Sequence, residues 1–148
     1  MSWNEIIEII ANLATAIGVA VAASQLWLTR GQDKTTFEDT FAREYRELAS
    51  TLPTKALLGE TLTHKEYCEA FDEFYHYIDL CNTQVFLHLE GRISDETWKY
   101  WRDGMETNLN RPAFKRAWSE IAAANGYFRE LKKEFPPTPI NSNEACKK

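Results

Sequence analysis

The N-terminal part of the chain carries its longest apolar stretch. Ile9 to Leu28 contains no charged residue and no proline, and Trp3 and Trp27 lie near its two ends. As a helix, this stretch is about 30 Å long, which matches the hydrocarbon thickness of a bilayer. Indole rings favour the membrane–water interface. The pattern predicts a transmembrane segment over residues 1–29.

Two alternatives to this span stay open. One is a buried helix of a soluble bundle, because four polar residues interrupt the stretch: Asn12, Thr15, Ser24 and Gln25. The other is a cleaved export signal, because "AVAAS" resembles a cleavage site. A signal of that kind carries positive charge ahead of its apolar region, whereas Glu5 and Glu8 precede this one.

Small residues recur along one face of the predicted span and permit close approach of helix backbones. They are Ala11, Ala14, Gly18 and Ala22. A polar stripe, formed by Glu8, Asn12 and Thr15, lies at spacings of four and three. Polar groups near a bilayer favour a partner or water over lipid. We therefore expect a homo-oligomer in which the stripe is paired between copies or lines a pore.

Charge around the span predicts its orientation. Arg30 and Lys34 follow the apolar stretch, and no Lys or Arg precedes Arg30. By the positive-inside rule, the N-terminus lies outside a bacterial inner membrane and residues 30–148 lie in the cytoplasm.

From Thr29 the sequence becomes polar but keeps helical periodicity as far as the C-terminal tail. An apolar stripe steps by three and four residues and ends before Pro53: Phe37, Phe41, Tyr45, Leu48 and Leu52. A loop follows through Gly59. Thr63 and Glu66 form a capping-box pattern that opens a second helix, which runs to about Glu90 and is terminated by Gly91. We expect this helix to be the central element.

Further signals for the start and end of helices divide the rest of the chain. Ser94 with Asp95 and Glu96 begins a third helix, and Pro112 begins a fourth, which stops near Asn125 and Gly126. A short last helix holds Phe128 and Leu131. No strand-like alternation appears. The prediction is an all-α fold with one span and about four cytoplasmic helices: a helical domain over 30–135 and a disordered tail over 136–148.

Composition narrows the function classes. The formal net charge of −5 argues against a general nucleic-acid ligand. One group of residues has a local excess of positive charge: Arg111, Lys115, Arg116, Arg129, Lys132 and Lys133. We expect it to be a solvated face, with contact to anionic lipid or to an acidic partner as the alternative. For the helical domain as a whole we expect a cytoplasmic protein partner. Cys68 and Cys81 lie in helical sequence and are expected in the core, with Cys146 a thiol in the tail. No metal-ligand spacing, phosphate-binding loop or nucleophile motif occurs, so we expect no metal and no cofactor.

One pair of residues is a candidate for catalysis. Asn82 and His88 have the polar-x-His spacing of helical RNA-cleaving domains, but no arginine stands four to six residues before any histidine. An arginine there would stabilise the scissile phosphate. Alternatively, both are polar residues of the core whose hydrogen bonds are satisfied by neighbouring groups. We favour a protein without enzymatic activity over an enzyme.

The segment from Phe74 to Ile121 resembles a group of small bacterial proteins with an N-terminal span and a helical domain. The resemblance lies in "Y-x-D-L-x-N", "W-x-x-W" and "R-P-A-F", and it extends from the span to about Leu131. The layout is also similar to membrane accessory proteins of RNA-targeting CRISPR systems, which join a span to a HEPN-like domain and assemble into rings. That second resemblance implies assembly and membrane perturbation in phage defence, with Asn82 and His88 as remnants of a nuclease motif. A membrane-tethered HEPN-like RNase and a passive membrane anchor that recruits a partner are the alternatives.

Overall fold

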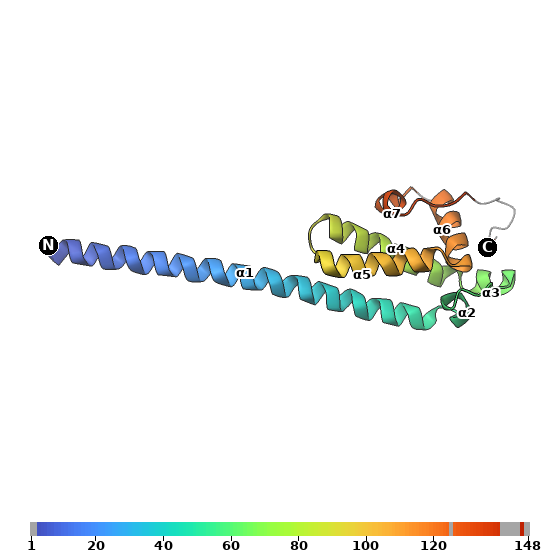
Figure 1. The fold of residues 1–148 in the computed structure, drawn as a ribbon, viewed down its shortest axis with the longest axis horizontal. Coiled ribbons are helices and arrows are strands. Elements are labelled where there is room, and N and C mark those ends of the chain that lie inside the picture. Colours follow the sequence, from blue (N-terminus) through green and yellow to red (C-terminus); the bar gives the residue numbers. More distant parts are fainter. Residues whose placement is uncertain (1–2, 125, 140–145, 147–148) are drawn as a thin grey trace. The chain divides into compact units, whose positions relative to one another are not determined.

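The described part of the chain is entirely helical. The computed structural model describes residues 3–124, 126–139 and 146, and it gives the backbone alone for residues 4–14, 16, 27–35 and 37. The helices, shown in Figure 1, are α1 (Trp3–Thr51), α2 (Thr54–Leu57), α3 (His64–Glu69), α4 (Phe71–Leu89), α5 (Asp95–Leu109), α6 (Pro112–Ala124) and α7 (Arg129–Glu134). Since these residues contain no strand, the predicted all-α class is confirmed.

The chain forms two compact units, which are described separately. The first comprises Met1–Thr36 and the second Phe37–Lys148. In the first unit, the described residues belong to α1 alone. The second unit, called the helical domain below, contains the end of α1 and all the other helices.

The predicted membrane span is not supported by the structure. Within the residues available for description, no helix combines the length and the apolar character needed to cross a membrane. Parts of the predicted segment lie outside the described part: residues 1 and 2 entirely, and the side chains of residues 4–14, 16 and 27–29.

Proline ends α1 as the sequence predicts. Pro53 disfavours helical backbone at the preceding residue and itself becomes the N-cap of α2, with φ −57° and ψ 125°. The expected loop is only partly a loop, because Thr54–Leu57 closes one helical turn. Gly59 then reverses the chain at φ +81°, a backbone conformation that costs glycine little.

The predicted central helix is divided into α3 and α4. Its start is confirmed: the Thr63 hydroxyl accepts from the Glu66 backbone N–H, and the Glu66 carboxylate accepts from the Thr63 N–H at 2.9 Å. Ala70 departs from helical geometry at φ −98° and ψ 11°. Because the Ala70 N–H bonds to Glu66 and the Phe74 N–H bonds to Ala70, backbone pairing continues across the bend.

The remaining boundaries follow the predicted signals. Gly91 has φ +68° just after α4, and the Ser94 hydroxyl caps α5 by accepting from the Thr97 N–H. Pro112 is the first residue of α6. The short last helix is α7, with Phe128 at its N-cap and Leu131 buried.

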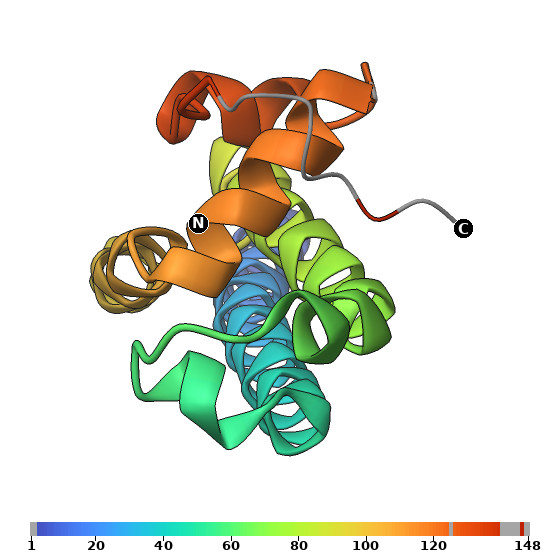
Figure 2. The same ribbon diagram turned by 90° about the vertical axis from the view of Figure 1, so that its right-hand side faces the viewer.

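The core of the helical domain forms around α4, as predicted. This helix packs on α6 and α7 and, less extensively, on α3 and α5; α6 also packs on α5, as Figure 2 shows from the end of the domain. Phe114 of α6 lies between Phe74 and Tyr77 of α4, with ring centroids 5.0 Å from each. All three side chains are buried. Edge-on aromatic packing thus fixes α6 against α4.

The buried side chain of Asn108 has its hydrogen-bonding groups paired in a small network inside this core. The Asn108 amide donates to the Tyr77 hydroxyl at 2.9 Å, and the Arg111 guanidinium donates to the Asn108 carbonyl. Burial raises the pKa of Tyr77 well above its usual value, which keeps the phenol neutral. The network joins α4 to the end of α5 at a defined register.

The cysteines differ from the prediction. Cys81 is buried, as expected, but Cys68 is only half-buried and forms a disulfide with Cys146, 78 residues later. Sequence spacing does not reveal this bridge, because it depends on where the chain returns after α7. Of the predicted disordered tail, residues 140–145, 147 and 148 lie outside the described part, while Cys146 is attached to α3.

Candidate functional site

The described face of the N-terminal unit is apolar and exposed. Every side chain from Ile17 to Leu26 is exposed, and the large aliphatic ones include Val19 at 65% and Leu26 at 63%. A helix that is apolar around its circumference is ordinarily covered by protein or lipid. This part of α1 is therefore the most distinctive candidate surface of the molecule.

The predicted residues of the span fall partly on this surface. Gly18, Ala22 and Thr15 are exposed. The other predicted positions lie outside the described side chains: Glu8, Ala11, Asn12 and Ala14. A Cβ built on Gly18 meets no atom within 4 Å, so nothing described within one copy requires a glycine there.

A polar side chain in the same region bonds to its own helix. The Ser24 hydroxyl donates to the Val21 carbonyl at 2.8 Å. A hydroxyl satisfied in this way costs less to place in apolar surroundings than an unpaired one.

The candidate nuclease residues face different helices. The Asn82 side-chain oxygen accepts from the Leu131 N–H of α7 at 3.4 Å, so it meets the start of that helix. His88 instead stacks on Trp98 of α5, with ring centroids 4.3 Å apart. Both side chains are half-buried, and the His88 Nδ1 atom is buried with no hydrogen-bond partner. The structure thus does not bring the two residues together in one cleft.

An acidic groove between α1 and α4 was not predicted. It has a volume of about 620 Å³ and lies within the helical domain. Phe41, Leu48 and Leu80 provide apolar lining, and the groove also contains His76. Its carboxylates are Glu44, Glu47, Glu73 and Asp79. The pairing of α1 with α4 could not be read from either helix alone.

The carboxylates of the acidic groove do not form a metal site in the described part of the chain. One oxygen of Glu73 is buried without a hydrogen-bond partner, but the side chain as a whole is half-buried. Among the described residues, no three His, Cys, Asp or Glu side chains are placed to hold a metal ion. The arrangement suits binding of a basic, partly apolar segment.

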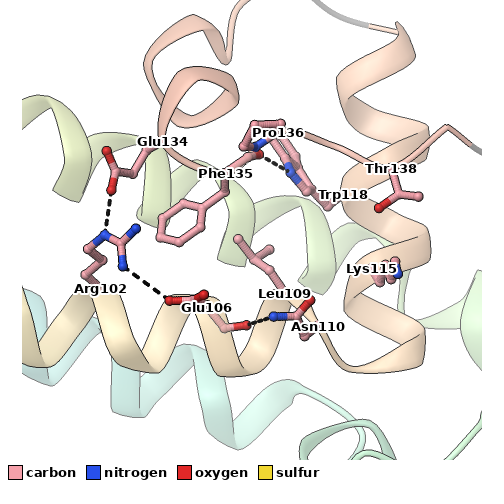
Figure 3. A pocket seen from close by; sticks show the side chains of 10 residues that line it. All are labelled: Arg102, Glu106, Leu109, Asn110, Lys115, Trp118, Glu134, Phe135, Pro136 and Thr138. Carbon is pink, nitrogen blue, oxygen red and sulfur yellow. Dashed lines mark hydrogen bonds and ion pairs between the residues drawn. The ribbon is translucent and has the colours of Figure 1, made fainter.

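A smaller cavity of about 220 Å³ lies where α7 meets α5 and α6. Figure 3 shows Arg102 bridging the Glu134 carboxylate at 2.6 Å and the Glu106 carboxylate at 3.2 Å. Trp118 donates its indole N–H to the Phe135 carbonyl at 2.9 Å. The hydrogen bond that Arg102 donates to Glu134 raises the pKa of the guanidinium, which stays charged. These groups hold the end of α7 in place, so the cavity is a structural junction.

Members of the predicted basic group pair with acidic residues on their own helices. Arg116 pairs with Glu120 at 3.0 Å on α6, whereas Arg129 and Lys133 both pair with Glu130 on α7. The contacts with Lys133 and Arg129 lower the pKa of the Glu130 carboxyl group. Much of the positive charge is thus balanced locally.

Comparison with known proteins identifies no relative. No family model matches the chain, and neither a curated protein nor a solved structure shows significant similarity to it.

Proposed function

We propose that this protein is a self-assembling inner-membrane protein, anchored by its N-terminal helix, whose helical domain binds a cytoplasmic partner. The exposed apolar surface from Ile17 to Leu26 is the observation that carries the proposal. Its sequence continues without charge from Ile9 to Leu28. Such a surface can be buried by lipid or by a second copy of the helix.

Self-association is supported by the small residues on one face. Gly18 and Ala22 are both exposed and four residues apart, so they share a face of α1. In a bilayer, helices associate where small side chains let backbones approach. Thr15 lies beside them, and with Glu8 and Asn12 it would face the same contact or line a pore between copies.

The acidic groove supports the docking part of the proposal. Its carboxylates and apolar lining suit a basic amphipathic segment of a partner protein. A synthetic Lys/Leu amphipathic helix is a suitable probe for this groove. The double variant E44K/E47K should weaken its binding, while D95K/E96K, which reverses two exposed charges on α5, should not. Equal binding to both variants would exclude the groove.

The resemblances found in the sequence extend the proposal to phage defence, in which assembled helices change membrane permeability when triggered. Vesicles of phosphatidylethanolamine and phosphatidylglycerol loaded with a fluorescent dye test this directly. A permeabilising assembly releases dye when full-length protein is added, and it loses this activity when the N-terminal helix is replaced by an unrelated span. A passive anchor releases no dye and keeps its cellular function after the same replacement.

Membrane attachment itself is tested by fractionation. We expect the full-length protein in the membrane fraction of a cell lysate, resistant to alkaline carbonate and released by detergent. Recovery in the aqueous fraction without detergent would refute the proposal. Release by carbonate alone would show a peripheral protein and would refute the span.

A further inference from the structure

Cys68 lies in a cluster of basic groups contributed by two helices of the domain. On its own helix, α3, the His64 ring lies one turn earlier, with Nε2 3.7 Å and Nδ1 3.9 Å from the Cys68 sulfur. From α6, the Arg116 Nη2 atom lies 3.2 Å from His64 Nδ1. The cluster belongs entirely to the helical domain.

The hydrogen bonds assign the His64 tautomer. Arginine has only donors, so the contact from Arg116 requires His64 Nδ1 to accept. The ring proton then lies on Nε2, the nitrogen closer to the Cys68 sulfur. His64 is thereby oriented as a hydrogen-bond donor to that sulfur, which favours a thiolate over a thiol.

Arg116 is held rigidly in this position. Its guanidinium lies 3.9 Å from the centre of the Tyr67 ring, and its Nε donates to Glu120 at 3.0 Å. Glu120 offsets part of the positive charge. The arginine therefore acts mainly by fixing the His64 tautomer and orientation.

The third cysteine has the opposite environment. Cys81 is fully buried beside Tyr77, and burial raises its pKa from 9.0 to about 12. A thiol of this kind is inert. Cys68 is half-buried, contacts the His64 ring and is already joined to Cys146.

We propose that Cys68 is an oxidant-responsive thiol for hydroperoxides and that Cys146 is its resolving partner. This inference rests on the proposed function, which places the helical domain in the cytoplasm, where a disulfide of this type is reversible and acts in redox sensing. In the first step, the Cys68 thiolate attacks a hydroperoxide oxygen. An S–O bond forms and the O–O bond breaks. The sulfur is oxidised to a sulfenic acid, the peroxide is reduced, and the leaving oxygen takes a proton to become water or an alcohol.

The second step forms the observed bridge. The Cys146 sulfur attacks the Cys68 sulfur, the S–S bond forms and the S–O bond breaks. The leaving hydroxide takes the proton of the Cys146 thiol and departs as water. A dithiol reductant restores both thiols by exchange, becoming a disulfide itself.

The test uses the full-length protein, reduced with dithiothreitol and freed of reductant without oxygen. Hydrogen peroxide should convert Cys68 and Cys146 into the disulfide, with the loss of two hydrogen masses and with Cys81 unchanged in a peptide map. In the C146S variant, dimedone should capture a sulfenic acid on Cys68. Capture at another cysteine, or no reaction with peroxide, would overturn the proposal.

A positioning role for His64 has its own readout. The H64F variant keeps a flat ring but has no donor, and we expect roughly tenfold slower sulfenic acid formation because the Cys68 thiolate loses its hydrogen-bond donor. K99F, on the exposed face of α5, introduces the same ring away from Cys68 and is the control, which should react at the wild-type rate. Circular dichroism confirms that each variant is folded. An unchanged rate in folded H64F would refute the role of His64.

Discussion

The imidazole of His88 lies parallel to the indole of Trp98, with ring centroids 4.3 Å apart and planes inclined by only 6°. This stack joins the end of α4 to the start of α5 across the turn at Gly91. Asn82 points instead to the backbone of α7. The two residues that the resemblance implies as remnants of a nuclease motif thus take part in separate contacts, a ring stack for His88 and a hydrogen bond for Asn82.

Replacing His88 with alanine should lower the free energy of unfolding, and we expect no RNA cleavage by either the wild type or the variant. A double-mutant cycle with W98A should give a coupling energy of about 1 kcal/mol, typical of aromatic pairs. The measurement is urea unfolding of the full chain in mild detergent, followed by tryptophan fluorescence. Labelled RNA incubated with wild-type and H88A protein provides the functional control. Cleavage by the wild type that disappears in H88A would restore the nuclease hypothesis.

Phe114 should be the most sensitive single position of the core. It is fully buried between Phe74 and Tyr77, so F114A removes contacts to two rings and leaves a cavity. We expect a loss of about 3–5 kcal/mol in the free energy of unfolding. Y100A, which truncates a side chain that is 79% exposed, should change stability by less than about 0.5 kcal/mol. Similar losses in both variants would contradict the assigned core.

Reduction of the Cys68–Cys146 bridge should destabilise the domain, because the unfolded chain gains conformational entropy when the bridge is opened. The bridge closes a loop over a separation of 78 residues, and chain-entropy arguments give about 4 kcal/mol for loops of this size. Differential scanning calorimetry with and without reductant measures the change. The double variant C68S/C146S should match the reduced protein and should not respond to reductant, while C81A should still respond.

Glu66 should make stability depend on pH in the acid range. A hydrogen bond from Lys55 at 2.7 Å, together with bonds from Thr63, lowers its pKa from 4.5 to about 2. Because the folded-state pKa is lower, the stabilisation is complete above pH 4.5 and is lost as the pH falls toward 2. Urea midpoints measured between pH 7 and pH 2 should fall less steeply in E66Q, which retains the capping geometry. E69Q, on the same helix, should follow the wild type.

Local signals explain how much of the fold was predictable. Pro53, the Thr63–Glu66 capping box, Ser94 and Pro112 each act within one turn of a helix, so the sequence marks those boundaries. Ala70 was missed because helical hydrogen bonding continues across it and alanine itself favours a helix. The helix α2 was missed because one turn produces no periodic pattern.

Contacts between distant segments explain what was not predictable in the candidate sites. The acidic groove needs α1 beside α4, and the cluster at Cys68 needs Arg116 from α6 and Cys146 from beyond α7. The stack of His88 on Trp98 likewise depends on the geometry of the turn between two helices. Spacing along one helix contains none of this information.

The central claim concerns the exposed apolar helix, and the mass of the detergent-extracted protein tests it most directly. Native mass spectrometry should show an assembly of several copies for the wild type and a single copy for G18L/A22L, because leucine at these positions keeps helix backbones apart. A20L enlarges the opposite face of α1 and should leave the assembly intact. A wild-type protein that is a single copy, or an assembly unchanged in G18L/A22L, would contradict the account.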